Sequence, residues 1–191
     1  MMRWFALATL ATLAACSMPE ETAERLDLGD FVLGHNIVVA PDLQKGPTSR
    51  NAEPDELIAA VKAAVDTRLG RYEGDRLVHL GINIGGYSLG RRGVPLVYTP
   101  KSDFVVAVSV WDDRAGEKFN EEPKQILVFE NFGEGAVIGT GYLKTRDEQI
   151  ATLAFNTARK IEAYLAENAA CLTEEPSEAE LAKCWLPDDP A

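Results

Sequence analysis

Residues 103–111 read Asp-Phe-Val-Val-Ala-Val-Ser-Val-Trp, and this stretch carries the strongest strand pattern in the chain. Valine, phenylalanine and tryptophan fit a pleated, half-buried surface well. Residues 112–116, Asp-Asp-Arg-Ala-Gly, have the composition of a turn. Residues 125–132 then return as a second apolar run. The pair predicts an antiparallel hairpin.

Two more strands are expected before this hairpin. Residues 31–40 contain the β-branched run from Ile37 to Val39, and Pro41 closes it. Residues 76–88 alternate apolar side chains with others. The glycines in this second stretch suggest β-bulges, because glycine in a strand often marks a break in regular pairing.

A first helix is expected between these two strands. Pro54 suits the first position of a helix, where its missing N–H costs nothing. Leu57, Val61 and Val65 then recur every four residues, and Gly70 follows the last apolar turn. This spacing predicts a helix with one buried face.

A second helix is expected after the hairpin. Thr145 and Glu148 fit a capping box, and an apolar stripe runs from Ile150 to Leu165. The resulting order is β-α-β-β-β-α. It predicts the α+β class: a two-layer sandwich with a mainly antiparallel sheet and both helices on one face.

The amino-terminal segment predicts export. Residues 1–15 combine a basic start, a short apolar run and small residues, which is the pattern of a signal peptide. The apolar run is much shorter than the roughly 20 residues that a membrane-spanning helix needs. Residues 13–16, Leu-Ala-Ala-Cys, resemble the lipobox of bacterial lipoproteins. The resemblance implies lipidation at Cys16, and Ser17 after it implies delivery to the outer membrane, on its periplasmic face.

The remaining chain divides by composition. Residues 16–30 are polar and acidic and predict a tether behind the lipidated cysteine, residues 31–168 a single domain, and residues 169–191 an acidic tail. Cys171 and Cys184 lie in or beside this tail. An exported protein can form disulfides, so we expect these two cysteines to be bonded. A redox pair would need the closer Cys-x-x-Cys spacing.

The charge of the protein excludes some classes of binding partner and allows others. The net charge is −11 at pH 7, and such a surface repels nucleic acid. Five arginines nevertheless occur close together in the sequence and could gather at one end of the sheet to contact an anion or an acidic partner. The alternative is a solvated rim with local ion pairs. These arginines are Arg68, Arg71, Arg76, Arg91 and Arg92.

One sequence motif points to hydrolysis. Residues 86–90, Gly-Tyr-Ser-Leu-Gly, match the nucleophile elbow of α/β-hydrolases, with Ser88 as the nucleophile. The elbow needs a helix directly after the serine, but residues 91–95 contain a glycine and a proline. Both histidines, His35 and His79, also precede Ser88, whereas that architecture places the histidine later. We therefore expect no enzyme activity.

Metal and cofactor sites are not expected either. His35 and His79 lack the spacing of zinc ligands. A glycine-rich run between residues 133 and 141 precedes the second helix, where backbone donors could hold an anion. That run lacks the Gly-Lys-Ser/Thr ending of a nucleotide-binding loop.

Two further segments carry a resemblance to known proteins. Residues 34–41 and 110–113 resemble small uncharacterised proteobacterial lipoproteins, and the element order of residues 31–168 is loosely similar to auxiliary envelope lipoproteins with a TolB-like amino-terminal domain. The small lipoproteins carry no assigned activity that could be transferred. From the anchor, the size of the domain and the missing catalytic order, we expect a lipid-anchored, non-enzymatic periplasmic protein that assists or stabilises an envelope assembly by binding another protein. Strand addition at a sheet edge would be one mode of binding.

Two other hypotheses remain from the sequence. The first is a module that binds a small ligand or an anionic lipid through the arginines and the loop at residues 85–93. The second is a serine hydrolase at Ser88, which would require His35 or His79 within hydrogen-bond reach of the serine.

Overall fold

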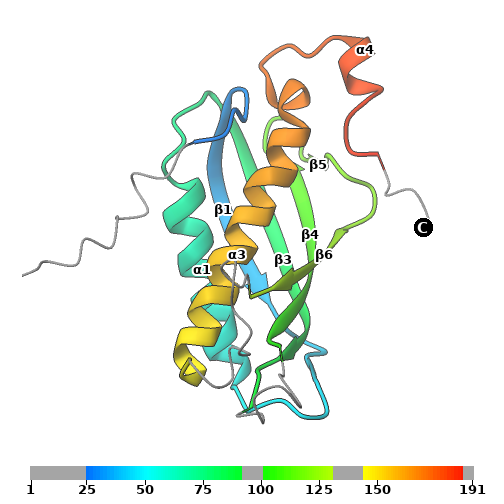
Figure 1. Cartoon of the computed structure of the whole chain (residues 1–191). Coiled ribbons are helices and arrows are strands. Elements are labelled where there is room, and N and C mark those ends of the chain that lie inside the picture. Colours follow the sequence, from blue (N-terminus) through cyan, green and yellow to red (C-terminus); the bar gives the residue numbers. More distant parts are fainter. Residues whose placement is uncertain (1–24, 92–100, 131–143, 187–191) are drawn as a thin grey trace, which may run out of the picture.

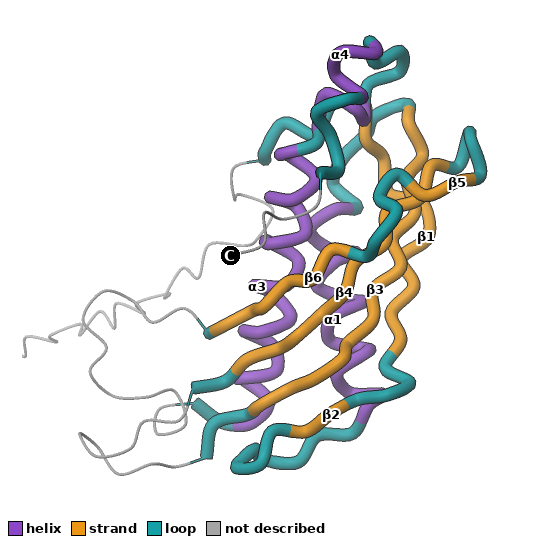
Figure 2. Tube along the Cα trace, turned by 90° about the vertical axis from the view of Figure 1, so that its right-hand side faces the viewer, coloured by secondary structure: helices purple, strands orange, loops and turns teal. Residues whose placement is uncertain are grey.

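A six-stranded sheet and two long helices form two layers in the computed structural model, which describes residues 25–91, 101–130 and 144–186. The helices α1 (Pro54–Leu69) and α3 (Arg146–Glu167) lie side by side on one face of the sheet (Figure 1). Viewed edge-on, the opposite face carries no long helix among the described residues (Figure 2). The predicted α+β class and the placement of both helices on one face are confirmed.

The central strand of the sheet is β3, the longest of the six. β1 pairs with it in parallel on one side, and β4 pairs with it in antiparallel on the other. β6 extends the sheet beyond β4 as the predicted hairpin partner. The strands are β1 (Phe31–Val39), β2 (Gln44–Lys45), β3 (Arg76–Ser88), β4 (Asp103–Asp112), β5 (Glu117–Lys118) and β6 (Lys124–Phe129).

The core fills the space between the helices and the sheet. α1 contributes the predicted residues Leu57, Val61 and Val65, all fully buried, and the stripe of α3 is buried against them. The alternate positions of β3 and β4 that face the helices are buried as well. Each such aliphatic side chain contributes about 1.5–3 kcal/mol relative to exposure, so this layer is the main source of stability.

Two irregularities interrupt the strand ladders. The β3–β4 register shifts between Ile84 and Gly86, which confirms the predicted bulge at the glycines. The β1–β3 register shifts between Leu33 and Asn36, which the sequence did not predict. This second irregularity holds His35 and takes part in the site described below.

Some boundaries differ from the sequence-based expectation. β6 ends at Phe129 and not at residue 132. The two-residue strands β2 and β5 were missed, because two residues are too short to show an alternating pattern. The capping box at Thr145 is confirmed: Glu148 N–H donates to its hydroxyl, and its own N–H donates to the Glu148 carboxylate. The glycine-rich run at residues 133–141 lies outside the described residues.

The tail packs onto the domain and onto the segment before β1. Cys171 and Cys184 are bonded, as predicted, and this disulfide joins the 3-10 turn η2 (Ala169–Leu172) to the segment that follows α4 (Glu178–Leu181). Leu28 is buried, and Asp30 N–H donates to the Leu172 carbonyl. The packed part of the chain therefore begins a few residues before the expected boundary at residue 31.

In the part of the chain that the structure describes, neither long helix is apolar enough over sufficient length to cross a bilayer. Cys16 lies outside the described residues.

Candidate binding site on the helix-free face of the sheet

The sheet face opposite the helices is unusually apolar. We call it the outer face, and it consists of the side chains of β1, β3, β4 and β6 that alternate with the buried core positions. Ile37 is 59% exposed there, and Leu127 is 47% exposed. Several large apolar side chains exposed on one face of a sheet favour an interaction site there. Its large apolar members are Ile37, Val39, Leu77, Val105, Trp111, Leu127 and Phe129.

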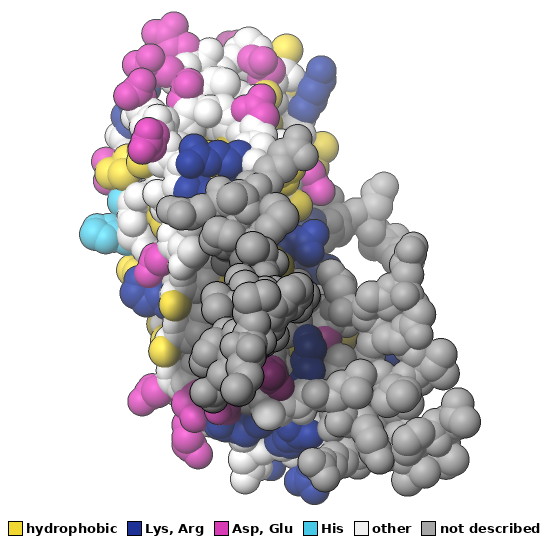
Figure 3. Space-filling model, turned by 60° about the vertical axis from the view of Figure 1, so that its left-hand side comes forward, with side chains coloured by type: hydrophobic (Ala, Val, Ile, Leu, Met, Phe, Trp, Pro, Cys, Tyr) yellow, Lys and Arg dark blue, Asp and Glu magenta, His cyan; other side chains and the backbone are white. Residues whose placement is uncertain are grey.

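A space-filling view shows this arrangement at the margin of the molecule. A histidine side chain protrudes at the left edge, and hydrophobic side chains lie above and below it along the same edge (Figure 3). Polar and apolar groups thus alternate along this rim of the outer face.

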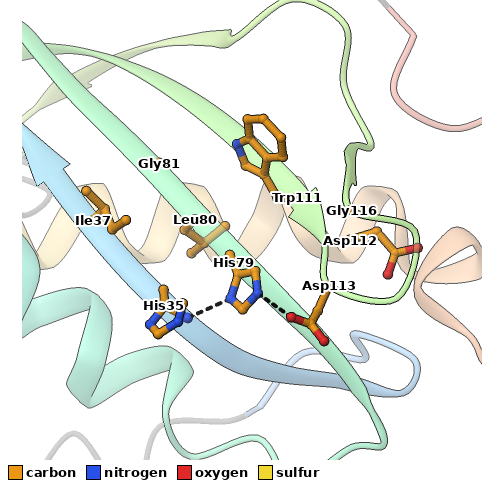
Figure 4. A pocket seen from close by; sticks show the side chains of 9 residues that line it. All are labelled: His35, Ile37, His79, Leu80, Gly81, Trp111, Asp112, Asp113 and Gly116. Carbon is orange, nitrogen blue, oxygen red and sulfur yellow. Dashed lines mark hydrogen bonds and ion pairs between the residues drawn. The ribbon is translucent and has the colours of Figure 1, made fainter.

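A pocket of about 330 Å³ opens on the outer face where β1, β3 and β4 run side by side. Figure 4 shows its lining: the two histidines line up with Asp113 on one side, Ile37 flanks them from β1, and Trp111 stands across from them on β4. Gly81 lies two residues further along β3 than His79, in register with Ile37 of β1 (Figure 4). The lining is mostly apolar, with one exposed carboxylate at its end.

The hydrogen bonds of His79 fix the state of its ring. The backbone N–H of His35 donates to His79 Nδ1 over 2.8 Å. A backbone amide can only donate, so Nδ1 is an unprotonated acceptor and the ring proton sits on Nε2. Nε2 then donates to Asp113 Oδ1 over 2.9 Å. His79 is held as a neutral, oriented imidazole.

The irregularity in β1 makes this arrangement possible. The register shift between Leu33 and Asn36 takes the N–H of His35 out of the regular ladder, and His79 supplies the missing acceptor. The His35 ring then stacks on the His79 ring, with 4.8 Å between their centres. Gly34 permits the contact, because a Cβ there would lie 2.3 Å from His79 Nδ1.

The two adjacent aspartates at the end of β4, Asp112 and Asp113, point in different directions. Asp112 is buried and accepts from Arg76 over 2.7 Å. Asp113 faces the pocket, and its side chain is 53% exposed. Its Oδ1 is used by His79, while Oδ2 has no hydrogen-bond partner among the described residues. Asp113 is thus the only charged group lining the pocket that is not matched by an arginine.

The five arginines do not form one patch. Arg76 begins β3, whereas Arg91 lies beyond its other end, about 40 Å away along an extended strand. Arg76 forms an ion pair with Asp112, and Arg91 donates to the Ser49 carbonyl. Arg92 lies outside the described residues. Of the two possibilities that the sequence left open, the gathering at one end of the sheet is not formed by the described arginines.

Arg68 and Arg71 belong to a buried cluster between α1 and α3. Both bind Glu162, over 2.6 and 2.8 Å, and the Tyr72 hydroxyl donates to the same carboxylate over 2.7 Å. Burial by itself would raise the pKa of Glu162, but the hydrogen bonds from Arg71, Tyr72 and Arg68 lower it below its ordinary value. Burial also raises the pKa of Tyr72. These groups hold the two helices together through ion pairs and hydrogen bonds to Glu162.

Ser88 has no histidine within reach. It ends β3, while His79 lies nine residues earlier on the same strand, about 30 Å away. His35 stacks on His79 and is equally distant. The chain has only these two histidines, so the hydrolase arrangement that the motif suggested is not formed. The described residues also hold no group of three or more histidine, cysteine or acidic side chains that could bind a metal ion.

The sequence analysis missed the cluster of His35, His79 and Asp113. One signal was available: alternation along residues 76–88 places His79 and Gly81 on the same face of the strand. The unforeseen irregularity in β1 brings His35 to them, and a turn brings Asp113.

Comparison with known proteins adds little. No family model matches the chain, and no curated protein matches it. Among solved structures, the fold is similar to a Xanthomonas campestris protein of the family DUF330, with a TM-score of 0.37, 11% identity, and 72% of this chain and 87% of that chain covered. It is also similar to a minor lipoprotein from Acinetobacter baumannii, with a TM-score of 0.30, 16% identity and coverages of 70% and 93%. Likeness at this level gives no ground for transferring an activity.

Proposed function

We propose that this protein is a lipid-anchored, non-enzymatic protein of the bacterial envelope that binds another protein through the outer face of its sheet. The observation that carries the proposal is the set of exposed apolar side chains that spans four neighbouring strands. The lipobox at Cys16 supports the anchor. Stable attachment needs more than one acyl chain, and a lipidated cysteine at a mature amino terminus provides this.

Docking on the face is favoured over strand addition at an edge. On β1, the Asn36 carbonyl accepts from Lys62 Nζ. On β6, the Leu127 and Phe129 carbonyls accept from Lys160 and Asn156 of α3. Side chains from the helices thus occupy acceptors that an added strand would need, and lysines at an edge discourage such pairing.

The described charged groups offer less support for a lipid or small anionic ligand. Three of the five arginines that would bind it are buried in ion pairs with Glu162 or Asp112. An apolar protein surface is the better match to an apolar sheet face, because burying it from water drives association.

Photo-crosslinking in native membranes tests the proposal. A photoreactive residue is placed at Val39 or Leu127, near opposite edges of the outer face, and at Ala63 as a matched control on the exposed surface of α1. We expect one protein adduct of the same mass from both outer-face positions and none from Ala63. Adducts with lipid alone, or equal labelling from Ala63, would refute the proposal.

A further inference from the structure

We infer that the pocket of His35, His79, Gly81, Trp111 and Asp113 receives an arginine side chain of the protein that binds the outer face. This inference rests on the proposed function and specifies the chemistry of the partner. An arginine has an apolar stem and a flat cationic end, and the pocket offers surfaces that suit both parts.

The first argument is the distribution of charge. Asp113 places one unmatched carboxylate at the end of a mostly apolar pocket, and Oδ2 is its open acceptor among the described residues. His79 contributes no positive charge, because Nδ1 accepts from the His35 amide. A cation is the natural complement, and the net charge of −11 attracts a basic partner over a longer range.

The second argument is the aromatic lining. A guanidinium group stacks well on indole and imidazole rings. Trp111 stands across the pocket from the stacked rings of His35 and His79 (Figure 4). The Trp111 ring already attracts a cation from this chain: Lys118 Nζ lies 5.3 Å from its centre, and Lys118 is not part of the pocket lining.

The third argument is the glycine in the pocket. Gly81 lies inside a long strand, where glycine costs stability relative to a residue with a side chain. Packing does not require it: a Cβ at Gly81 would meet Ser109 Cβ at 3.8 Å as its nearest neighbour, which is an ordinary contact. Glycine in a strand often marks a place where another molecule approaches closely. Here it leaves open the space next to His79, between Ile37 of β1 and Ser109 of β4.

Three variants distinguish the contribution of the open space at Gly81 from that of the negative charge on Asp113. Gly81→Val fills the pocket with a residue that favours strands. Gly85→Val is the matched control, because Gly85 lies four residues further along the same strand, and a Cβ there has only the Val105 carbonyl oxygen near it, at 3.8 Å. Asp113→Asn removes the charge but keeps an oxygen that can accept from His79 Nε2.

The experiment titrates the full mature lipoprotein in detergent micelles with N-acetyl-arginine amide, and with the norleucine analogue as an uncharged control. The nuclear magnetic resonance signals of the Trp111 indole and the Gly81 amide report on the pocket, and the Trp185 indole serves as an internal reference. We expect saturable shifts with a dissociation constant on the order of 1 mM for the arginine amide. Asp113→Asn should weaken binding about fivefold, Gly81→Val should abolish it, and Gly85→Val should leave it unchanged.

The outcomes are distinct. Equal binding of the norleucine amide, unchanged affinity in Asp113→Asn, or the absence of saturable shifts would overturn the inference. If the arginine amide fails to bind while crosslinking from Val39 and Leu127 still yields the protein adduct, the inference fails and the proposed function stands. If that adduct is also missing, the proposed function fails with it.

Discussion

The backbone N–H of His35 donates to the side chain of His79, so one strand completes its hydrogen bonding through a side chain of its neighbour. Nε2 of the same imidazole donates a hydrogen bond to Asp113 Oδ1. Three separate segments, β1, β3 and the turn after β4, therefore depend on one ring. This dependence gives the pocket a fixed shape before any partner arrives, which lowers the cost of binding.

Replacing His79 should loosen the β1 irregularity. We expect His79→Ala to lower the free energy of unfolding by about 1–2 kcal/mol, because the hydrogen bonds with the His35 amide and with Asp113 are both lost. His79→Asn should lose less, since its side-chain oxygen can take the place of Nδ1. Urea unfolding measures both, and hydrogen exchange at the His35 amide reports the local effect. Equal exchange at that amide in all three proteins would show that the imidazole does not hold the strand.

The core and the candidate site differ in how far the sequence predicts them. Valine at alternate positions in β4 and the four-residue spacing in α1 reflect burial on one side, so period and composition were enough to find them. These features depend on local patterns in the sequence. The parallel pairing of β1 with β3 was not predicted, although a helix between two strands is the usual connection of a parallel pair.

The pocket depends on contacts that local patterns do not encode. Its histidines are 44 residues apart in the chain, and they meet only because a register shift in β1 turns one amide toward the other side chain. For the arginines, the sequence suggested a contact that the structure does not form. Closeness in sequence suggested a patch, but Arg68 and Arg71 lie on or just beyond a helix facing Glu162, while Arg76 starts a strand facing Asp112.

The buried carboxylate between the helices should control stability in acid. The pKa of Glu162 is lowered in the folded state, so its contribution is fully present above the ordinary glutamate pKa and is lost as the pH falls through the lower, folded value. We expect Glu162→Gln to reduce the free energy of unfolding at pH 7 by about 3 kcal/mol, since it removes the buried negative charge that Arg68 and Arg71 both bind. The difference from the natural protein should shrink below about pH 4.

Urea unfolding at pH 7 and at about pH 3 measures this effect. Glu167→Gln is the matched control, because Glu167 lies exposed at the end of the same helix. It should change stability by less than about 0.5 kcal/mol at either pH. A Glu162→Gln deficit that is equally large at both values would contradict the assignment of the stabilisation to the charged carboxylate.

The anchor can be tested apart from the folded domain. We expect Cys16→Ser to move the protein from the membrane fraction to the soluble fraction, because the thiol that carries the acyl chains is removed. Mass spectrometry of the natural protein should find the mature chain beginning at an acylated Cys16. Cys171→Ser is a useful comparison, since it removes a different cysteine and should leave membrane attachment unchanged. An unmodified Cys16 in a membrane-free protein would end the lipoprotein interpretation.

The disulfide should stabilise the tail more than it stabilises the sheet. Cys171 and Cys184 are 13 residues apart, and closing a loop of this size contributes about 3 kcal/mol in the chain-entropy account. Trp185, next to the bond, stacks on Phe119 with 5.3 Å between ring centres, and its backbone N–H donates to the side-chain oxygen of Asn168. Reduction, or the double variant Cys171→Ala with Cys184→Ala, should therefore release Trp185 and change its fluorescence.

The Trp111 indole signal should stay in place, because the pocket on the outer face does not include the tail. Simultaneous change at both tryptophans would instead mean that the tail and the sheet unfold as one unit.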